Sequence, residues 1–182
     1  MGTLRKHKPV KLFVGLIFQN QHFADLAREE LISLYGPIEE FSISFPFIQT
    51  DYYNEEFGLH LIRSFICFKN LSPAEDLWKI KIASNQIEEK FSDSGKRVIN
   101  IDPGYITPAK LLLFTTKDYS HRVYIGNGIF TEVTLYFQKG SFKAWPWTYP
   151  DYAIEEVIKY FNTIRGIYMK SINDGQKIEI KE

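Results

Sequence analysis

The residues best suited to chemistry lie on either side of one short turn, Gly126-Asn127-Gly128. Lys117 and Arg122 precede this turn, His121 lies next to Arg122, and Glu132 follows the turn. Lysine and arginine supply positive charge and hydrogen-bond donors to phosphate or carboxylate groups, histidine exchanges a proton near neutral pH, and glutamate can act as a base. This combination predicts a site for a phosphorylated or nucleotide-like small molecule.

Side chains of the strand after Gly128 alternate between an apolar face and a mixed face, and this alternation predicts how Arg122 and Glu132 face each other. Its apolar face carries Ile129, Thr131, Val133, Leu135 and Phe137. Because cross-strand partners point to the same side of a sheet, a three-residue loop centred on Asn127 keeps the faces consistent, with Gly128 in the left-handed conformation. The predicted pairs are Ile125 with Ile129, Tyr124 with Phe130, and Arg122 with Glu132. We therefore expect Arg122 and Glu132 to be neighbours, as a surface ion pair or as part of a polar site, on a face shared with Tyr124, Phe130, Thr134 and Tyr136.

Three other places in the sequence could contribute to this site. Asp102 opens the run Asp102-Pro103-Gly104, where it could act as a base or cap a type II turn. Lys110 and Lys117 flank an apolar strand, so they either bind an anion or end the strand in water. Tyr52 and Tyr53 lie in a polar loop and could stack on a ring-shaped ligand or cover a sheet edge.

The candidate catalytic residues are therefore His121, Glu132 and Asp102. The candidate ligand-binding residues are Lys110, Lys117, Arg122, Tyr52 and Tyr53. Each also has a structural interpretation; His121, for example, needs only one hydrogen-bond partner to serve as a structural histidine. The spacing of histidine and cysteine predicts no metal site, and no motif names a cofactor, so whether the protein is an enzyme stays open.

Composition narrows the class of protein. The 182 residues suit one domain over residues 1–182, and 45% hydrophobic residues are enough for a substantial core. Lys and Arg number 22, as do Asp and Glu, so the net charge is zero and nucleic-acid binding is not expected. The apolar run over residues 12–18 is far shorter than the roughly 20 residues that span a bilayer. With no signal peptide, and with one cysteine, Cys67, in an apolar stretch, we expect a cytoplasmic protein without a membrane segment.

Hydrophobic periodicity predicts the elements that must position these residues. A buried strand over 10–18 precedes a helix that ends at Gly36-Pro37, and strands over 38–45 and 59–68 follow. The capping box Ser72-Pro73-Ala74-Glu75 predicts the next helix start, and a short strand then ends at Asp102-Pro103-Gly104. This βαββαβ order is the split βαβ arrangement of ferredoxin-like domains. Antiparallel hairpins and a helix over 151–170 extend it, so the predicted fold class is α+β.

Large aromatic side chains gather near the start of the last helix. They are Trp145, Trp147, Tyr149 and Tyr152, beside Pro146 and Pro150. Aromatics in an irregular segment either close off the core or form a contact patch for another protein. The second interpretation leaves a non-enzymatic interaction domain or a homodimer as the alternative function.

Several short motifs occur together along nearly the whole chain. The most distinctive are residues 9–15 (PVKLFVG), 100–105 (NIDPGY), 132–135 (EVTL) and 147–152 (WTYPDY). In this combination the sequence resembles the prokaryotic domain-of-unknown-function family DUF4416, some members of which are labelled GTP-binding. The resemblance implies no established activity and no catalytic residues.

The GTP label can be compared with the residues themselves. A P-loop needs G-x-x-x-x-G-K followed by Ser or Thr, whereas Gly95-Lys96 is followed by Arg97. Gly126-Asn127-Gly128 lies between two strands and predicts a hairpin instead of a phosphate-binding loop. Nucleotide binding of the P-loop kind is therefore not expected.

Overall fold

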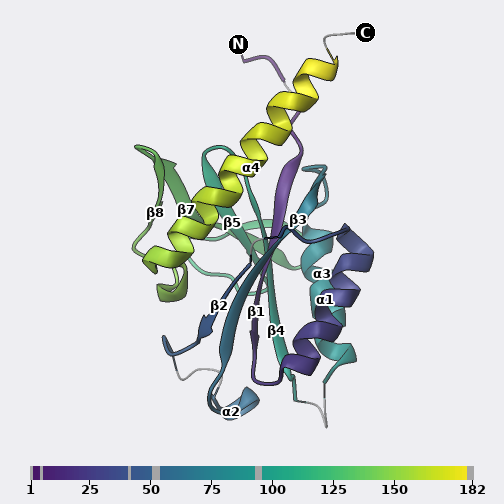
Figure 1. Ribbon diagram of the computed structural model, residues 1–182, viewed down its shortest axis with the longest axis vertical. Coiled ribbons are helices and arrows are strands. Elements are labelled where there is room, and N and C mark those ends of the chain that lie inside the picture. The colour runs from purple at the N-terminus through teal and green to yellow at the C-terminus, as the bar shows by residue number, and fades with distance from the viewer. Residues whose placement is uncertain (1, 5, 41, 51–53, 93–95, 180–182) are drawn as a thin grey trace.

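The protein is an α+β structure built on one antiparallel sheet, as predicted, with a long C-terminal helix (Figure 1). The computed structural model describes residues 2–4, 6–40, 42–50, 54–92 and 96–179. The strands are β1 (Val10–Phe18), β2 (Ile43–Pro46), β3 (Ile62–Ser72), β4 (Ile99–Ile106), β5 (Lys110–Thr115), β6 (Val123–Gly126), β7 (Ile129–Gln138) and β8 (Ser141–Ala144). The helices are α1 (Gln21–Tyr35), α2 (Asn54–Phe57), α3 (Trp78–Lys90), a 3₁₀ helix (Pro150–Tyr152) and α4 (Glu155–Glu179). The strand order is β2-β3-β1-β4-β5-β7-β6, and β8 also pairs with β7.

Strand β1 lies inside the sheet and is buried on both faces. Its even-numbered residues, such as Val14 and Leu16, belong to a core shared with α1 and α3. Phe13 points the other way into a second core under α4, and Figure 1 shows α4 on the opposite side of the sheet from α1 and α3. Burying one such side chain stabilises the fold by about 1.5–3 kcal/mol, so the two cores fix the sheet between the helices.

The ends of α1 and the apolar stripe of α4 follow the sequence closely. Asn20 caps α1 by accepting the backbone N–H of His22 at 2.9 Å, and Gly36 ends it with φ of 87°. Helix α4 buries residues at helical spacing against the sheet, namely Val157, Phe161, Ile164 and Tyr168. None of the helices, over the residues described, is both long and apolar enough to cross a membrane.

Strand β4 continues through Asp102-Pro103-Gly104, so the predicted turn there is wrong. Only Gly104, Tyr105 and Ile106 pair with β5, and the two strands diverge before Gly104. Gly104 allows the close approach where pairing begins, because a Cβ there would lie 2.2 Å from the Leu112 carbonyl oxygen. Pro103 comes where β4 has no β5 partner, and proline has no N–H to leave unpaired there.

The predicted start of the second long helix is also wrong. Strand β3 extends to Ser72, which pairs with Val10, so the supposed capping residue is already in the sheet. Helix α3 begins at Trp78, after a turn in which Asp76 adopts a positive φ of 58°. Strand pairing therefore overrides the local helix signal at this point.

Candidate functional site

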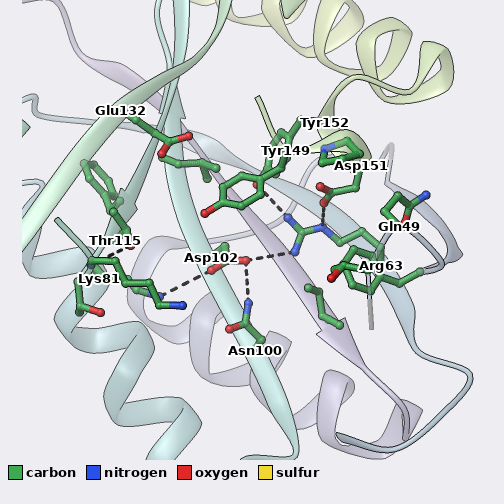
Figure 2. A pocket seen from close by; sticks show the side chains of 18 of the residues that line it. Gln49, Arg63, Lys81, Asn100, Asp102, Thr115, Glu132, Tyr149, Asp151 and Tyr152 are labelled. Atoms are coloured by element: carbon green, nitrogen blue, oxygen red, sulfur yellow. Dashed lines mark hydrogen bonds and ion pairs between the residues drawn. The ribbon is translucent and has the colours of Figure 1, made fainter. Parts of the chain in front are cut away.

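A cavity of about 700 Å³ lies where β4 and β5 diverge (Figure 2). Side chains reach it from both faces of the sheet, including Lys81 and Glu88 of α3 on one side and Asp151 of the 3₁₀ helix on the other. Its charged lining consists of Arg63, Lys81, Arg97, Lys117, Arg122, Glu88, Asp102, Glu132 and Asp151. So many charged groups around one space are costly to bury unless they pair with each other.

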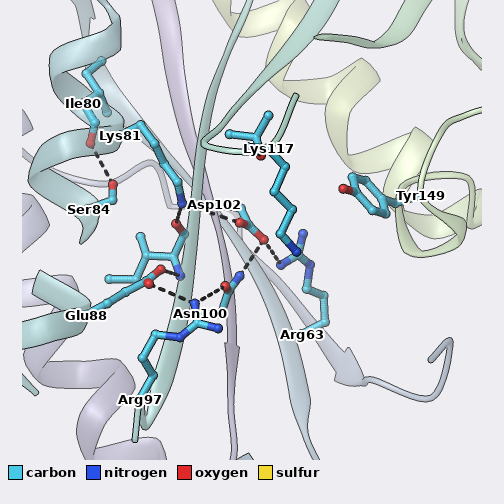
Figure 3. Close-up of polar contacts among 12 residues, drawn as sticks. Arg63, Ile80, Lys81, Ser84, Glu88, Arg97, Asn100, Asp102, Lys117 and Tyr149 are labelled. Carbon is cyan, nitrogen blue, oxygen red and sulfur yellow. Dashed lines mark hydrogen bonds and ion pairs between the residues drawn. The ribbon is translucent and has the colours of Figure 1, made fainter. Parts of the chain in front are cut away.

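Two side chains of α3 take the place of the missing strand beside β4. The Ile101 N–H donates to Glu88 Oε1 at 2.6 Å, and the Ile101 carbonyl accepts from Lys81 Nζ at 2.9 Å. Backbone groups alternate along a strand, so Pro103 presents its backbone to the same open side as Ile101. The gap therefore leaves few unpaired backbone groups, and it admits Lys81 to the cavity (Figure 3).

Arg63, from β3, forms the centre of the first ion-pair cluster. It is 1% exposed, its Nε lies 2.9 Å from Asp151 Oδ2, and its Nη1 lies 3.3 Å from Asp102 Oδ2. Its Nη2 donates to the Tyr152 hydroxyl at 3.0 Å. Gly15 makes room for this guanidinium, because a Cβ at that position would lie 2.8 Å from Arg63 Nη2.

Burial shifts the titration of two carboxyl groups at the cavity. Burial raises the pKa of Asp151, and the nearby Arg63 guanidinium opposes this effect. Burial likewise raises the pKa of Glu88, against the opposing charge of Lys81. Each of these acids holds its proton more tightly than in water and depends on a cation to stay ionised.

Arg122 and Glu132 form the second cluster and are neighbours, as the hairpin register predicts. Arg122 Nε donates to Glu132 Oε2 at 2.8 Å, and Tyr124 pairs with Phe130. The predicted three-residue loop is wrong. The turn contains Asn127 and Gly128, both with positive φ, and a bulge between Tyr124 and Gly126 pairs Gly126 with Ile129 in place of Ile125. The bulge supplies the extra residue that keeps both charged side chains on one face.

A second bulge changes which residues share that face. Leu111 pairs with Leu135 and Leu113 pairs with Glu132, so Thr134 is an extra residue in β7. Leu135 therefore lies on the face of Glu132, and the prediction that puts Tyr136 there is wrong. The alternation in the sequence gives no sign of the bulge because the residues beyond it continue the same pattern.

The remaining contacts of Arg122 hold it at the edge of the cavity. Its Nη1 donates to the Lys117 carbonyl at 3.0 Å, and its Nη2 donates to the Tyr149 hydroxyl at 2.7 Å. The guanidinium lies 4.5 Å from the centre of the Tyr119 ring. Burial lowers the pKa of Arg122, but the hydrogen bonds and charge interactions with Glu132 and Tyr149 outweigh this effect and raise it. Arg122 is thus a permanent cation, with its orientation fixed by these contacts.

His121 lies behind Glu132 and is not among the described residues that line the cavity. Its Nε2 is 3.2 Å from Glu132 Oε2. Its ring stacks with Tyr119, at 6.1 Å between ring centres, and with Trp147, at 5.5 Å. With its ring against two aromatic side chains and Nε2 on Glu132, His121 is placed to orient Glu132.

The predicted site residues are thus only partly brought together. Asp102, Lys117, Arg122 and Glu132 line the cavity. Lys110 begins β5 opposite Tyr136, at the other end of the strand from the cavity. Tyr52 and Tyr53 lie outside the described residues.

The predicted aromatic cluster divides between core and surface. Tyr152 is buried in the core under α4, whereas Trp145 and Trp147 are about one-third exposed and stack with ring centres 5.1 Å apart. Tyr149 is 44% exposed and lines the cavity. Cys67 is buried, as expected of a small apolar side chain, and burial raises the pKa of its thiol to about 12.

Sequence reasoning missed Arg63, Lys81 and Glu88. Arg63 is the one charge in the run 61–68 (LIRSFICF), and a lone arginine in a buried strand is a signal of a paired internal charge. Lys81 and Glu88 lie seven positions apart on α3, so they share the helix face that carries Ile80 and Ile87. Both signals are visible in the sequence, although neither reveals the partners.

The comparisons with known proteins give a family and no activity. A family model described as a domain of unknown function (DUF4416) matches residues 8–168. The chain belongs to this family. No curated protein and no solved structure matches.

The matched range of the DUF4416 model includes every residue that lines the cavity, from Ile17 to Tyr152. Within the described ranges, no three histidine, cysteine or acidic side chains gather in a way that suits a metal ion. The lining of the cavity offers charged groups, hydroxyls and amides.

Proposed function

We propose that the protein binds an anionic small molecule, phosphorylated or nucleotide-like, in the cavity between β4 and β5. The observation that carries the proposal is the placement of Lys117 beside two buried arginines in one cavity. Lys117 is exposed, lines the cavity, and in Figure 3 its side chain points toward Asp102 and Arg63. A flexible ammonium at the mouth of a cavity is well suited to contact a phosphate that enters from solvent.

The size and polarity of the cavity support a ligand of this class. Pockets for small molecules span roughly 300–1,000 Å³, and the cavity measures about 700 Å³. Thr115, Thr116 and Tyr149 add hydroxyl groups near Lys117, and hydroxyls are ordinary partners for phosphate oxygens. Phe47 and Phe114 add apolar surface that can contact a ring.

The second cluster takes a supporting role in this proposal. Glu132 accepts hydrogen bonds from Arg122, His121 and Thr134, so its carboxylate is occupied. Glu132 and His121 then act as positioning residues that hold Arg122 at the cavity. Of the three candidate catalytic residues, Asp102 is the one that lines the cavity with an oxygen that accepts no hydrogen bond from the described residues, and no reaction is assigned to it.

A binding screen tests the proposal. Thermal shift and calorimetry would use inorganic phosphate, sugar phosphates, GMP, GTP and ATP with the full chain. A ligand at one hundred times its Kd stabilises the protein by about 2.7 kcal/mol. Lys117→Gln should weaken binding at least tenfold, whereas the matched control Lys110→Gln, at the other end of β5, should not. If none of the probes stabilises the wild-type protein, the proposal is wrong.

Self-association is the second candidate function, and one observation favours it. Strand β6 is an edge of the sheet, and Val123 and Tyr124 on it are 65% and 59% exposed. An edge strand with exposed apolar side chains can pair with the same edge of a second copy. Light scattering over a range of concentrations would detect the dimer, and Val123→Lys should abolish it. A monomer at every concentration would remove this candidate.

We also propose that β1 to β4, with α1 and α3, form a ferredoxin-like unit and that the protein works in the cytoplasm of a prokaryote. The support for the first is that β3 lies between β1 and β2, with β4 on the other side of β1 and all pairs antiparallel. The support for the second is a lone buried thiol at Cys67, which needs no oxidising compartment. Superposition of an experimental structure on ferredoxin-like domains, and imaging of a fluorescent fusion, would test the two.

A further inference from the structure

We propose that the ligand of this cavity carries an N–H donor, an amine or amide group, in addition to its anionic group, and that this donor binds Oδ1 of Asp102. This inference rests on the proposed function. It adds a second recognition element and so narrows the ligand class to phosphorylated molecules that also carry a nitrogen donor.

The two oxygens of Asp102 differ in their partners. Oδ2 accepts from Asn100 Nδ2 at 2.7 Å and lies 3.3 Å from Arg63 Nη1. Oδ1 accepts no hydrogen bond from any residue that the structure describes, and Lys81 Nζ is 3.9 Å away, beyond hydrogen-bond reach. The side chain is 28% exposed and lines the cavity. One oxygen of this carboxylate is therefore available to a bound molecule.

The other three carboxylates of the cavity lack this combination. The side chains of Glu88, Glu132 and Asp151 are each at most 7% exposed. Glu88 accepts from the Ile101 N–H and from Arg97, and Glu132 accepts from Arg122 and Thr134. Asp102 differs from these three because it is held by one oxygen and open at the other, in the centre of the cluster that Figure 3 shows.

An ionised carboxylate inside an anion site is unfavourable for a ligand that is only anionic. It repels the phosphate, and a bound ligand would remove water from an oxygen that accepts no hydrogen bond from the described residues. A ligand nitrogen that donates to Oδ1 removes the second penalty, and a cationic amine also offsets the first. Asn85 of α3 also lines the cavity, and its side-chain amide makes no hydrogen bond within the described part of the chain. Its oxygen can accept a second N–H of the same group.

Matched pairs of probes test the inference on the unmodified protein. Calorimetry would compare glucosamine 6-phosphate with glucose 6-phosphate, and O-phosphoethanolamine with ethyl phosphate. In each pair the two molecules differ mainly in the amino group. We expect the amino compound to bind about tenfold or more tightly in at least one pair, since a charged donor on a carboxylate is a strong hydrogen bond.

Variants test whether Asp102 causes the preference for the amino compound. Asp102→Asn should abolish the preference for the amino compound over its amine-free partner. The matched control Asp118→Asn, an exposed carboxyl outside the cavity, should keep the preference. Because Asp102→Asn also removes a partner of Arg63, circular dichroism must show that it is folded. Asn85→Ser, which leaves the ion pairs intact, should reduce the same preference.

Two results would contradict the inference in different ways. Equal affinity within both pairs would overturn it and leave the proposed function standing, because phosphate binding would be intact. Absence of binding by all four probes, together with a negative screen of the other phosphates, would overturn the proposed function and this inference with it.

Discussion

Arg63 and Arg122 flank the same cavity and are built in parallel ways. Each pairs with a buried carboxylate, each donates to a tyrosine hydroxyl, and each lies against an aromatic ring. They differ in depth. Arg63 is 1% exposed and is shared by Asp102 and Asp151, whereas Arg122 is 8% exposed and also donates to a backbone carbonyl.

The difference separates a structural cation from a peripheral one. Arg63 neutralises two carboxylates from elements that meet only in the folded protein, so it joins β3, β4 and the 3₁₀ helix across the core. Arg122 belongs to one hairpin. Its partner Glu132 also has His121 and Thr134 as hydrogen-bond donors. We infer that the Arg63 cluster mainly maintains the cavity. The Arg122 cluster mainly determines which polar groups the edge of the cavity presents to a ligand.

Replacing the two arginines should give the largest effect and test this order directly. Arg63→Met leaves Asp151 buried without its cation, which should cost about 3–5 kcal/mol of unfolding free energy. Arg122→Met should cost less, about 1–3 kcal/mol, because Glu132 still has His121 and Thr134 as partners. Urea unfolding of both variants measures the two values. An Arg122 variant less stable than the Arg63 variant would reverse the comparison.

Gly15→Ala perturbs Arg63 without changing any charge. The added Cβ would lie 2.8 Å from Nη2 and 2.9 Å from Cζ of Arg63, so the guanidinium must shift. We expect a loss of about 1–3 kcal/mol, the usual range for overpacking a core.

Gly166→Ala is the matched control for that substitution. Gly166 lies within α4 with no atom within 4 Å of the added Cβ among the described residues. Because alanine is the better helix former, this change should stabilise by about 0.5–1 kcal/mol. If both alanines have the same effect in urea unfolding, the account of Gly15 is wrong.

The pH dependence of stability should differ between the inner and outer carboxyl groups. Burial raises the pKa of Asp151 above its ordinary 3.8, so the folded protein binds this proton more tightly than the unfolded chain. Its contribution to stability is complete below pH 3.8 and is lost as pH rises through the raised pKa. The stability of the wild type relative to Asp151→Asn should therefore fall as pH rises from about 4, as measured by urea unfolding at each pH.

Glu56 should show the opposite sign. Two hydrogen bonds from Arg97 lower the pKa of Glu56 below its ordinary 4.5. Its contribution is present above pH 4.5 and is lost as pH falls through the lowered pKa. The stability of the wild type relative to Glu56→Gln should rise with pH, and parallel slopes for the two variants would contradict the assignment.

The sequence predicts well where interactions are local. The end of α1 at Gly36 depends on neighbouring residues, and this prediction is confirmed. The contact between Arg122 and Glu132 is equally local, since ten positions separate them. The contact is present although the predicted loop is wrong, because the bulge between Tyr124 and Gly126 keeps Arg122 and Glu132 on the same face of the hairpin.

The sequence predicts the structure poorly where contacts between distant residues determine the local conformation. Asp102-Pro103-Gly104 reads as a turn, yet pairing with β1 on one side and the gap on the other keeps it a strand. Arg63 meets Asp102 and Tyr152 across 39 and 89 positions of chain, and no local pattern reports such contacts. The cavity depends on the divergence of β4 and β5, so it could not be predicted before the strand order was known.

The most direct test of the account is the affinity of the folded protein for a phosphorylated ligand, measured by calorimetry for the wild type, Lys117→Gln and Lys110→Gln. We expect measurable binding that Lys117→Gln weakens at least tenfold and Lys110→Gln leaves unchanged. Equal binding by all three proteins, or equal losses in both variants, would contradict a binding site between β4 and β5.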